Sequence, residues 1–352
     1  MKLRDFARHL KLSSSTVSRA LNGYADVNAQ TRARVQAAAA RLGYMPHPAG
    51  LKLRTGRTDM ICVVLPRPQV QFATPFFLDI LTGVDEVLSP TRYELIVTAV
   101  RERGDETATF RRIVESRRVD GLIFGRTRTR DARIAYLLER GFPFVALGRS
   151  GNDRRFAFID IDHEASGRIA AERLAAGGHR RIALINTLRE FNYSRLCAKG
   201  FAAGLATSGV ALDERLIVDA DMTEESGFTA MAALLRASPP PTGVVCGNDM
   251  LAFGALRAIR AAGLEPGTEI GIIGCDDHPL SRTTSPPLTS FAAPVRAAGA
   301  QAARMLLQLI EGTSPDRLQE VWEPQLVARA SDGGSPPLSR VKLARRRHVV
   351  GA

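Results

Sequence analysis

Short apolar runs alternate with longer amphipathic segments from residue 59 onward, and this alternation restricts the fold more than any other feature. MICVVLP precedes FFLDILTGVDEVL, YELIVTAV precedes ETATFRRIVESR, and DGLIFG precedes RDARIAYLLERG. The alternation starts again at GRIAAERLAAGG and continues through RIALIN, GVVCGN and IGIIGCDD. Such a pattern is typical of parallel sheets covered on both faces. We therefore predict that residues 59–330 form two doubly wound α/β halves facing each other across a cleft.

The positive charge of the chain is concentrated at its ends. Residues 1–57 contain 11 Lys and Arg against two acidic residues, and residues 331–352 contain five against one. The segment between them is nearly neutral, with 32 basic and 33 acidic residues. A short basic segment on a neutral body indicates binding to a polyanion. An arm kept only for solubility is the alternative.

The basic N-terminal segment has the pattern of three small helices within residues 1–45. Apolar residues recur at helical spacing over residues 3–10 and again over residues 12–21, with a break between them. Ser13 is placed to cap the second helix, and Asn22 and Gly23 are placed to end it. Asn28 and Gly43 bound the third helix in the same way. Three such helices can just close a core.

The second helix presents short polar side chains outward. Because Val17, Ala20 and Leu21 face the predicted core, four residues lie on the opposite side: Ser14, Ser15, Ser18 and Arg19. A helix of this kind fits the DNA major groove, where hydroxyl groups donate or accept and arginine grips guanine with two hydrogen bonds. A serine-rich face that only contacts solvent is the alternative.

STVSRALNG followed by VNAQTRARVQAAAARLGYMP resembles the lactose/galactose repressor (LacI/GalR-type) family of bacterial transcription regulators. Matching strings follow in order along nearly the whole chain, including VDGLIFG, GHRRIALI, GNDMLAFGALRAI and SPPLTSF. The resemblance implies an all-α helix-turn-helix domain joined to a periplasmic-binding-protein-like sensor of two parallel-sheet subdomains. It also implies that Ser14, Ser15 and Arg19 read bases, while Thr16, Asn22 and Thr31 contact phosphates. Lys11 stands where the family often has glycine in the turn.

Residues 46–58 are predicted to be a hinge. Pro48 and Gly50 argue for a linker rather than an isolated helix. The resemblance implies that this stretch becomes helical only when paired with its dimer mate on DNA. It places Leu53 where a leucine wedges into the minor groove. Gly50 and Leu51 replace the Ala-Arg pair that the family more often carries.

Polar residues follow the predicted strands of the larger segment. Carboxylate and amide groups bind sugar hydroxyls well, and the resemblance places effector contacts at Asn248 and Asp276. Asp249 and Asp277 are predicted instead to cap helices or turns. Cys197 and Met222 occupy slots where the family often has arginine and an aromatic platform. Stacking can come from Phe76, Phe191 or Tyr193. The predicted effector contacts are Phe76, Arg149, Tyr193, Cys197, Met222, Asn248 and Asp276.

The predicted effector is a small molecule, with a sugar or sugar derivative favoured. Arg149 and Arg195 leave room for an anionic ligand. The sign of the response, with an inducer or a corepressor, stays open. A two-fold protein matches a palindromic operator, so we predict a homodimer on double-stranded DNA.

Two other classes of protein compete with a ligand-responsive regulator. A sugar-binding transport protein shares the two-lobed architecture but needs an export signal, and MKLRDFARHL lacks the apolar core of one. An enzyme such as a glycosidase or sugar kinase is disfavoured because no phosphate-binding loop motif occurs. Asp276 and Asp277 are adjacent, and on an extended chain they point in opposite directions.

The remaining expectations concern location, cofactors and the C-terminus. The four cysteines are scattered singly, at positions 62, 197, 246 and 275, without metal-ligand spacing. We expect no catalytic residues, cofactor or metal, and no membrane span, so a cytoplasmic location is predicted. Residues 331–352 lack the leucine heptads that would make tetramers and are predicted to be a disordered basic tail.

Overall fold

The computed structural model describes residues 1, 3–21, 24–44, 57–66, 75–100, 106–151, 153 and 155–333. The chain divides into two compact units, Met1–Asp59 and Met60–Ala352, and each is described by itself.

The N-terminal unit contains the three predicted helices, α1 (Leu3–His9), α2 (Ser14–Leu21) and α3 (Ala29–Leu42). Both predicted caps are confirmed: the Thr16 amide donates to Ser13 Oγ at 3.0 Å, and the Thr31 amide donates to Asn28 Oδ1 at 2.7 Å. Gly43 ends α3 in the left-handed conformation. Asn22 and Gly23, predicted to end α2, lie outside the described residues.

The small core of this unit gathers one face of each helix. Phe6, Val17, Ala20 and Val35 have no exposed surface. The turn between α1 and α2 places Lys11 at φ +53°, in the left-handed region that favours glycine. The backbone is therefore sterically strained at Lys11, where the family that the sequence resembles often has glycine.

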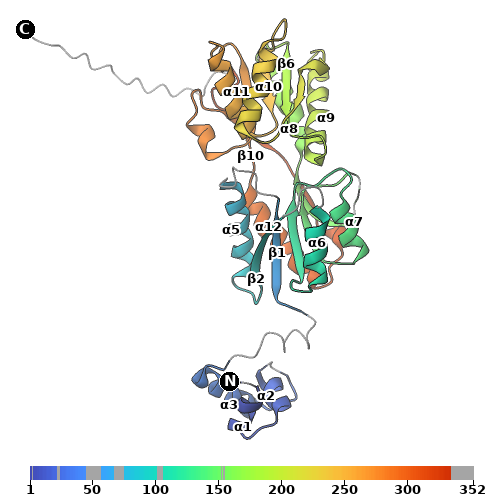
Figure 1. Cartoon of the computed structure of the whole chain (residues 1–352), viewed down its shortest axis with the longest axis vertical. Coiled ribbons are helices and arrows are strands. Elements are labelled where there is room, and N and C mark those ends of the chain that lie inside the picture. The colour runs from blue at the N-terminus through green and yellow to red at the C-terminus, as the bar shows by residue number, and fades with distance from the viewer. Residues whose placement is uncertain are drawn as a thin grey trace, which may run out of the picture. The chain divides into compact units, whose positions relative to one another are not determined.

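The larger unit contains two six-stranded sheets, which define lobe 1 and lobe 2 (Figure 1). The strands of lobe 1 lie in the order β11-β5-β4-β3-β1-β2, and those of lobe 2 in the order β12-β10-β9-β8-β6-β7. Lobe 1 contains β1 (Met60–Leu65), β2 (Glu94–Ala99), β3 (Gly121–Gly125), β4 (Phe144–Leu147), β5 (Ala157–Ile161), β11 (Gln319–Trp322), α5 (Pro75–Leu88), α6 (Glu106–Glu115), α7 (Ala132–Glu139) and α12 (Val295–Ile310). Lobe 2 contains β6 (Ile182–Asn186), β7 (Ile217–Asp219), β8 (Gly243–Cys246), β9 (Gly271–Asp276), β10 (Thr289–Ala292), β12 (Gln325–Val327), α8 (His163–Ala176), α9 (Asn192–Thr207), α10 (Glu224–Leu235) and α11 (Asp249–Ala261).

Helices cover both faces of each sheet. In lobe 1, α5 and α12 pack on one apolar face, and α6 and α7 pack on the other. In lobe 2, α10 and α11 share one core, and α8 and α9 share the other. All strand pairs are parallel except β10 with β12. The predicted fold class, a helical N-terminal domain with two doubly wound parallel-sheet subdomains, is confirmed.

The two lobes are not consecutive halves of the chain. The chain passes between them three times: from β5 to α8, from β10 to α12, and from β11 to β12. As a result α12 and β11 complete lobe 1 after most of lobe 2 has been built. Figure 1 shows β10 where the two lobes meet.

Ordered packing continues into the predicted tail. Ser331 and Asp332 are buried, and Asp332 forms an ion pair with Arg173 of α8. The expectation that the disordered tail begins at residue 331 is therefore wrong for these positions. The rest of the predicted tail, residues 334–352, lies outside the described residues.

Candidate functional site

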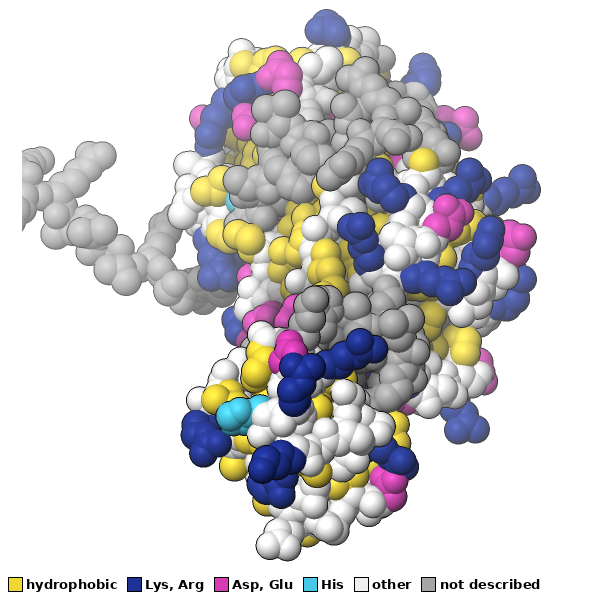
Figure 2. All heavy atoms as spheres, turned by 60° about the horizontal axis from the view of Figure 1, so that its bottom comes forward, with side chains coloured by type: hydrophobic (Ala, Val, Ile, Leu, Met, Phe, Trp, Pro, Cys, Tyr) yellow, Lys and Arg dark blue, Asp and Glu magenta, His cyan; other side chains and the backbone are white. Residues whose placement is uncertain are grey.

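The outward side of α2 carries the predicted DNA-contacting residues. Ser15 and Arg19 are exposed, and Ser14, Thr16 and Ser18 are partly exposed. Thr31, in the first turn of α3, is also partly exposed. On the face of the N-terminal unit seen in Figure 2, Lys and Arg side chains lie among white polar surface, and Asp and Glu side chains are few.

Arg19 is held by neighbours within its own unit. Its guanidinium pairs with the Asp26 carboxylate and lies 5.5 Å from the centre of the Tyr24 ring. About half of each charged side chain remains exposed, 51% for Arg19 and 47% for Asp26. Asp26 therefore competes for the guanidinium that is predicted to read a base. The other predicted contacts, Asn22 and Leu53, lie outside the described residues.

In lobe 2, three of the predicted effector residues lie close together. The Tyr193 hydroxyl donates to Met222 Sδ at 3.4 Å. Tyr193 and Cys197, both on α9, line a cavity of about 20 Å³ together with His163 and Cys275. The Tyr193 ring stacks on Phe191 at 5.5 Å, and burial raises the pKa of its hydroxyl to about 12. Burial also raises the pKa of the Cys197 thiol to about 12, which disfavours the thiolate form.

The Asp276 carboxylate lies at the carboxyl end of β9 and has no hydrogen-bond partner among the residues that the structure describes. Burial and the charge of Asp249 raise its pKa well above the ordinary value, and Arg126 opposes this shift. Both Asp276 (φ +110°) and Asp277 (φ +46°) have positive φ. The expectation of an extended chain here is wrong, although the two carboxylates do diverge: Asp277 pairs with Arg329.

The predicted division between ligand contacts and caps is partly wrong. Asn248 is the residue that caps α11, because its Oδ1 accepts from the Leu251 amide at 2.9 Å. Asp249 caps nothing in α11. Its buried carboxylate accepts from the hydroxyls of Ser281 and Ser290, at 2.7 and 2.6 Å, and from the His278 amide. Burial raises the pKa of Asp249 to about 6 despite these hydrogen bonds. The capping role leaves the Asn248 amide nitrogen available to a ligand.

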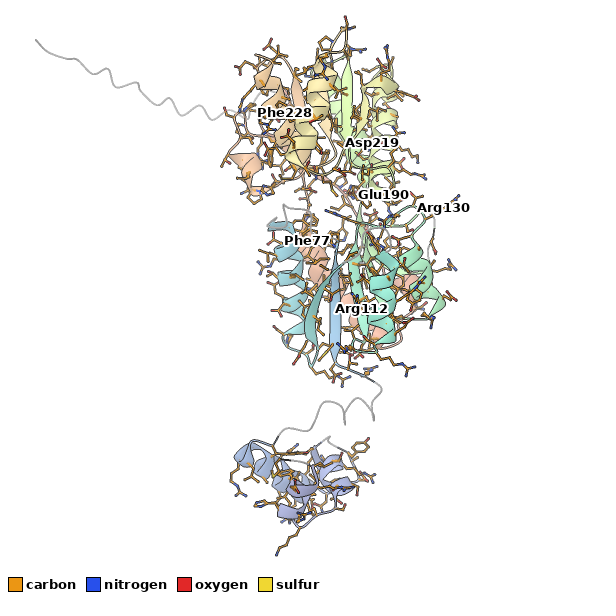
Figure 3. All side chains as sticks on the ribbon, viewed as in Figure 1. Phe77, Arg112, Arg130, Glu190, Asp219 and Phe228 are labelled. Carbon is orange, nitrogen blue, oxygen red and sulfur yellow. The ribbon has the colours of Figure 1, made fainter. Side chains whose placement is uncertain are left out.

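The remaining predicted residues, Arg149 and Phe76, lie in lobe 1. Arg149 Nε donates to Asp160 at 2.7 Å and so pairs its charge, while its buried Nη2 has no hydrogen-bond partner within the described residues. Phe76 packs against the core of lobe 1 and meets Phe77 edge-on at 5.6 Å. Figure 3 places Phe77 at the end of lobe 1 that faces lobe 2. The ring contact of Phe76 is with Phe77 of its own helix, and it does not reach the group around Tyr193.

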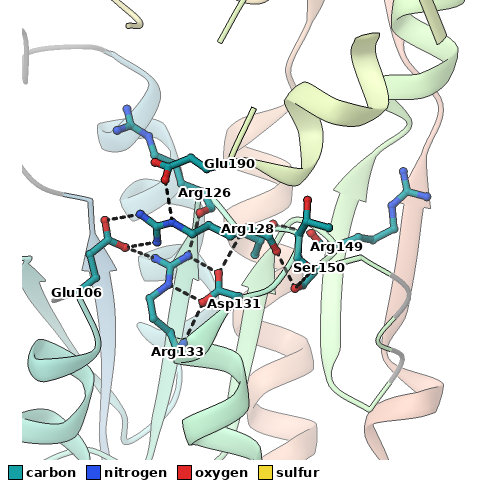
Figure 4. A network of polar contacts seen from close by, with 10 residues as sticks. Glu106, Arg126, Arg128, Asp131, Arg133, Arg149, Ser150 and Glu190 are labelled. Atoms are coloured by element: carbon teal, nitrogen blue, oxygen red, sulfur yellow. Dashed lines mark hydrogen bonds and ion pairs between the residues drawn. The ribbon is translucent and has the colours of Figure 1, made fainter. Parts of the chain in front are cut away.

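Arg126, which directly follows β3, is a residue that the sequence patterns missed. It adopts φ +52°, and its carbonyl accepts from Arg133 Nη2 at 2.8 Å. Its guanidinium has no hydrogen bond or ion pair within the described part of the chain, and Figure 4 shows it without a contact to the other residues drawn. Burial lowers its pKa despite the nearby charges of Tyr193, Glu106 and Asp276. The carbonyl of the next residue, Thr127, accepts from the Asn192 amide of lobe 2 at 2.9 Å, so Arg126 lies beside the segment that carries Tyr193.

The residues after Arg126 bind the two lobes together, and we call this contact the clasp, formed by residues 127–129 and 190–192. Arg128 pairs with Phe191 in an antiparallel bridge. The Asn192 amide donates to the Thr127 carbonyl at 2.9 Å, and the Thr129 amide donates to the Glu190 carbonyl at 3.4 Å. Arg126 and Tyr193 directly flank the clasp, so its position sets theirs.

Arg128, the arginine of the clasp, forms ion pairs with neighbouring carboxylates (Figure 4). Arg128 donates to both carboxylate oxygens of Glu106, at 2.7 and 3.2 Å, and its Nε lies 3.5 Å from Glu190. The pKa of Arg128 is raised, chiefly by the hydrogen bonds to Glu106. Buried Arg133 pairs with Asp131 at 2.7 Å and lies 3.2 Å from Glu106. The network fixes one side of the interlobe contact before any ligand arrives.

Comparison with known proteins finds a matching family model in each of the two units. Residues 2–47 match the model of bacterial regulatory proteins of the lacI family, and residues 171–331 match the periplasmic binding protein-like domain. The HTH-type transcriptional regulator AglR of Rhizobium meliloti (strain 1021) is 39% identical over 345 residues, which cover 96% of each chain. The chain belongs to the lacI family of bacterial regulatory proteins.

Solved structures of lacI-family members share the whole architecture. A complex of the transcriptional regulator CelR with cellobiose is 31% identical, with a TM-score of 0.73 over 94% of this chain and 99% of that one. A lac repressor dimer bound to operator and the anti-inducer ONPF is 28% identical, with a TM-score of 0.80 over 94% and 98%. The family consists of transcriptional regulators rather than enzymes. No helix in the described ranges is long and apolar enough to cross a membrane.

Proposed function

We propose that this lacI-family member is a cytoplasmic, homodimeric repressor that binds a palindromic DNA operator and whose operator affinity is controlled by a sugar or sugar derivative between the lobes. Residues 1–45 bind DNA, residues 46–58 form the hinge, and residues 59–330 sense the effector. One observation carries the proposal: a single chain joins a helix with a polar outward side to two lobes whose facing strand ends bear polar groups without partners.

On the DNA side, Ser14, Ser15 and Arg19 contact base edges in the major groove. Thr16, Asn22 and Thr31 contact phosphates, and Leu53 enters the minor groove. Ser18 contacts DNA from the same outward side of α2. The exposed polar side of α2, opposite fully buried Val17 and Ala20, supports this assignment. The operator complex of the lac repressor dimer, a relative of the same architecture, supports it too.

Exposed apolar side chains support the homodimer. Leu78 of α5 and Val97 of β2 are 66% and 44% exposed, and these two elements of lobe 1 contact each other. β2 is an edge strand, with an unpaired side available to another chain. Leu280 of lobe 2 is 55% exposed. A second copy that covers these side chains removes them from water and brings two DNA-reading helices to one palindrome.

The effector contacts come from both lobes. The group around Tyr193, Met222, Cys197 and Asp276 offers an aromatic ring, an apolar wall and a carboxylate, which together suit a sugar ring and its hydroxyls. The amide nitrogen of Asn248 adds a donor. The cellobiose complex of CelR supports a saccharide. Three connections and the clasp join the lobes, so a ligand that prefers one arrangement of the lobes changes the geometry presented to the hinges.

Selection of DNA from a random library by the full chain tests the DNA-binding part of this proposal. We expect enrichment of a palindrome that the dimer binds more tightly than random sequence. Addition of neutral and acidic saccharides to the operator complex then tests the sensor, because an inducer releases DNA and a corepressor tightens it. A protein that selects no sequence, or whose operator affinity responds to no saccharide, contradicts the proposal.

A further inference from the structure

We propose that Arg126 is the lobe 1 contact for the effector, and that Arg126 and Asp276 together select a neutral ligand with hydroxyl groups placed to reach both lobes. This inference rests on the proposed function. It goes beyond it by naming a residue outside the predicted effector set and by choosing between the neutral and the anionic ligand.

Arg126 and Asp276 both carry a charged group that lacks a partner among the described residues. In the described part of the chain, neither the guanidinium of Arg126 nor the carboxylate of Asp276 forms a hydrogen bond or a close ion pair. Most other arginines near them are paired: Arg149 with Asp160, Arg128 with Glu106, and Arg133 with Asp131. A partly buried charged group without hydrogen bonds is costly, so a ligand that supplies them binds favourably.

Arg126 follows β3 of lobe 1, and Asp276 ends β9 of lobe 2. The Asn192 amide donates to the carbonyl of Thr127, the residue after Arg126, at 2.9 Å, and Tyr193, the residue after Asn192, lines one cavity with Cys275, the residue before Asp276. These contacts place Arg126 and Asp276 on the two sides of the junction between the lobes. Arg126 is fixed by the hydrogen bond from Arg133 to its carbonyl and by the clasp that starts at Thr127. Both residues have positive φ, which turns the chain sharply after each strand.

The hydrogen-bonding capacities of the two side chains indicate the ligand class. Arg126 can only donate hydrogen bonds, whereas an ionised Asp276 can only accept them. A hydroxyl group donates and accepts, so a polyol satisfies both residues at once. An anionic group pairs with Arg126 but offers no donor to the Asp276 carboxyl group, and it is repelled wherever that group is ionised. Arg149 does not shift the balance toward an anion, because Asp160 and Asp162 lie beside it.

The alternative is that Arg126 serves only as a distant counter-charge for Asp276 and touches no ligand. In that case a lysine at position 126 keeps the function, since it keeps the charge. A contact that uses the flat, multi-donor guanidinium does not survive the change to lysine. This difference makes the role of Arg126 measurable.

Isothermal titration of the full chain with cellobiose, maltose, raffinose and glucose 6-phosphate tests the inference, using wild type, Arg126→Gln, Arg126→Lys and the control Arg130→Gln. Arg130 lies in the same loop but is exposed, and Figure 3 places it at the outer edge of the interlobe region. We expect wild type and Arg130→Gln to bind a neutral saccharide alike. Both Arg126 variants should weaken binding about 10-fold or more, as loss of hydrogen bonds to a charged group predicts.

Three results overturn parts of the account separately. If wild type and Arg126→Gln bind saccharide with equal affinity, Arg126 does not contact the ligand, and the proposed function is unaffected. If Arg126→Lys binds as tightly as wild type, position 126 supplies only a positive charge. Preference of the wild type for glucose 6-phosphate overturns the neutral ligand class. Failure of every probe to bind wild-type protein contradicts the saccharide sensor itself. Thermal unfolding and operator binding of each variant show whether it is folded.

Discussion

Replacement of Arg19 by alanine tests whether α2 reads DNA bases. A bidentate contact between arginine and guanine discriminates against the wrong base by about 1–3 kcal/mol. We therefore expect Arg19→Ala to weaken operator binding by about 5- to 150-fold and to relax preference at one base pair of each half-site. Fluorescence anisotropy with the operator and its single-base variants measures both effects. Equal weakening on operator and random DNA shows a phosphate contact instead.

The ion pair of Arg19 with Asp26 sharpens this test. Both side chains are about half exposed, so the pair contributes no more than about 1 kcal/mol. Replacing Asp26 by asparagine releases the guanidinium and should tighten operator binding by up to about 5-fold. Asp5→Asn is a matched control, because it makes the same change of charge but breaks a pair with Arg8 instead.

The two carboxylate variants separate release of Arg19 from a general change of charge. We expect Asp26→Asn to gain more than Asp5→Asn in wild-type protein and to gain no more than Asp5→Asn when Arg19 is already alanine. Such a cycle isolates the coupling between Asp26 and Arg19. Equal gains from both variants in wild-type protein refute the view that Asp26 restrains the base-reading side chain.

Three further changes test other parts of the structure. Lys11→Gly relieves the left-handed strain of the α1–α2 turn and should stabilise the N-terminal unit by about 0.5–1 kcal/mol, slowing amide exchange in α1 and α2, whereas faster exchange contradicts this. Glu190→Gln weakens the clasp and should speed exchange of the Thr129 and Asn192 amides by up to about 5-fold, unlike Asp219→Asn, which breaks the exposed pair with Arg189. Asp249 has a folded-state pKa of about 6, above its ordinary value of 3.8, so its protonated form stabilises the fold at low pH and this contribution is lost as pH rises from about 4 to 6. The difference in unfolding free energy between wild type and Asp249→Asn should therefore change over that range, and a constant difference contradicts the raised pKa.

Local sequence patterns were sufficient to predict the N-terminal helices and most of the alternating strands and helices. The spacing of Phe6, Val17 and Val35 reports burial within single helices, and caps such as Asn28 act within three residues of the chain. Four strands next to the passages between the lobes are only three to five residues long and contain polar residues: β5, β10, β11 and β12. The apolar pattern that would predict them from the sequence is therefore weak. The return of α12 to lobe 1 depends on contacts between distant segments, which no local pattern contains.

The residues between the lobes were also only partly predictable from the sequence. Tyr193, Met222 and Asp276 were predicted because they follow recognisable strands and family slots, and the structure brings Tyr193 and Met222 into contact. Arg126 and Arg128 were missed because RTRTR reads as a solvated basic loop. Only the fold shows that Arg128 bridges to Glu106 and Glu190 while Arg126 stays without a partner. A cluster of alternating arginines directly after a buried strand was the available signal.

The operator affinity of the full chain, measured with and without a saccharide that it binds, tests the central claim most directly when wild type is compared with Asp276→Ala. Without saccharide, the two proteins should bind operator equally, because Asp276 lies in the other unit from α2. With saccharide, wild-type affinity should change by about 5- to 150-fold, the usual range of coupling between two sites, and the variant should not respond. A saccharide that binds wild-type protein without changing operator affinity, or a full response from Asp276→Ala, contradicts the claim that a ligand between the lobes controls DNA binding.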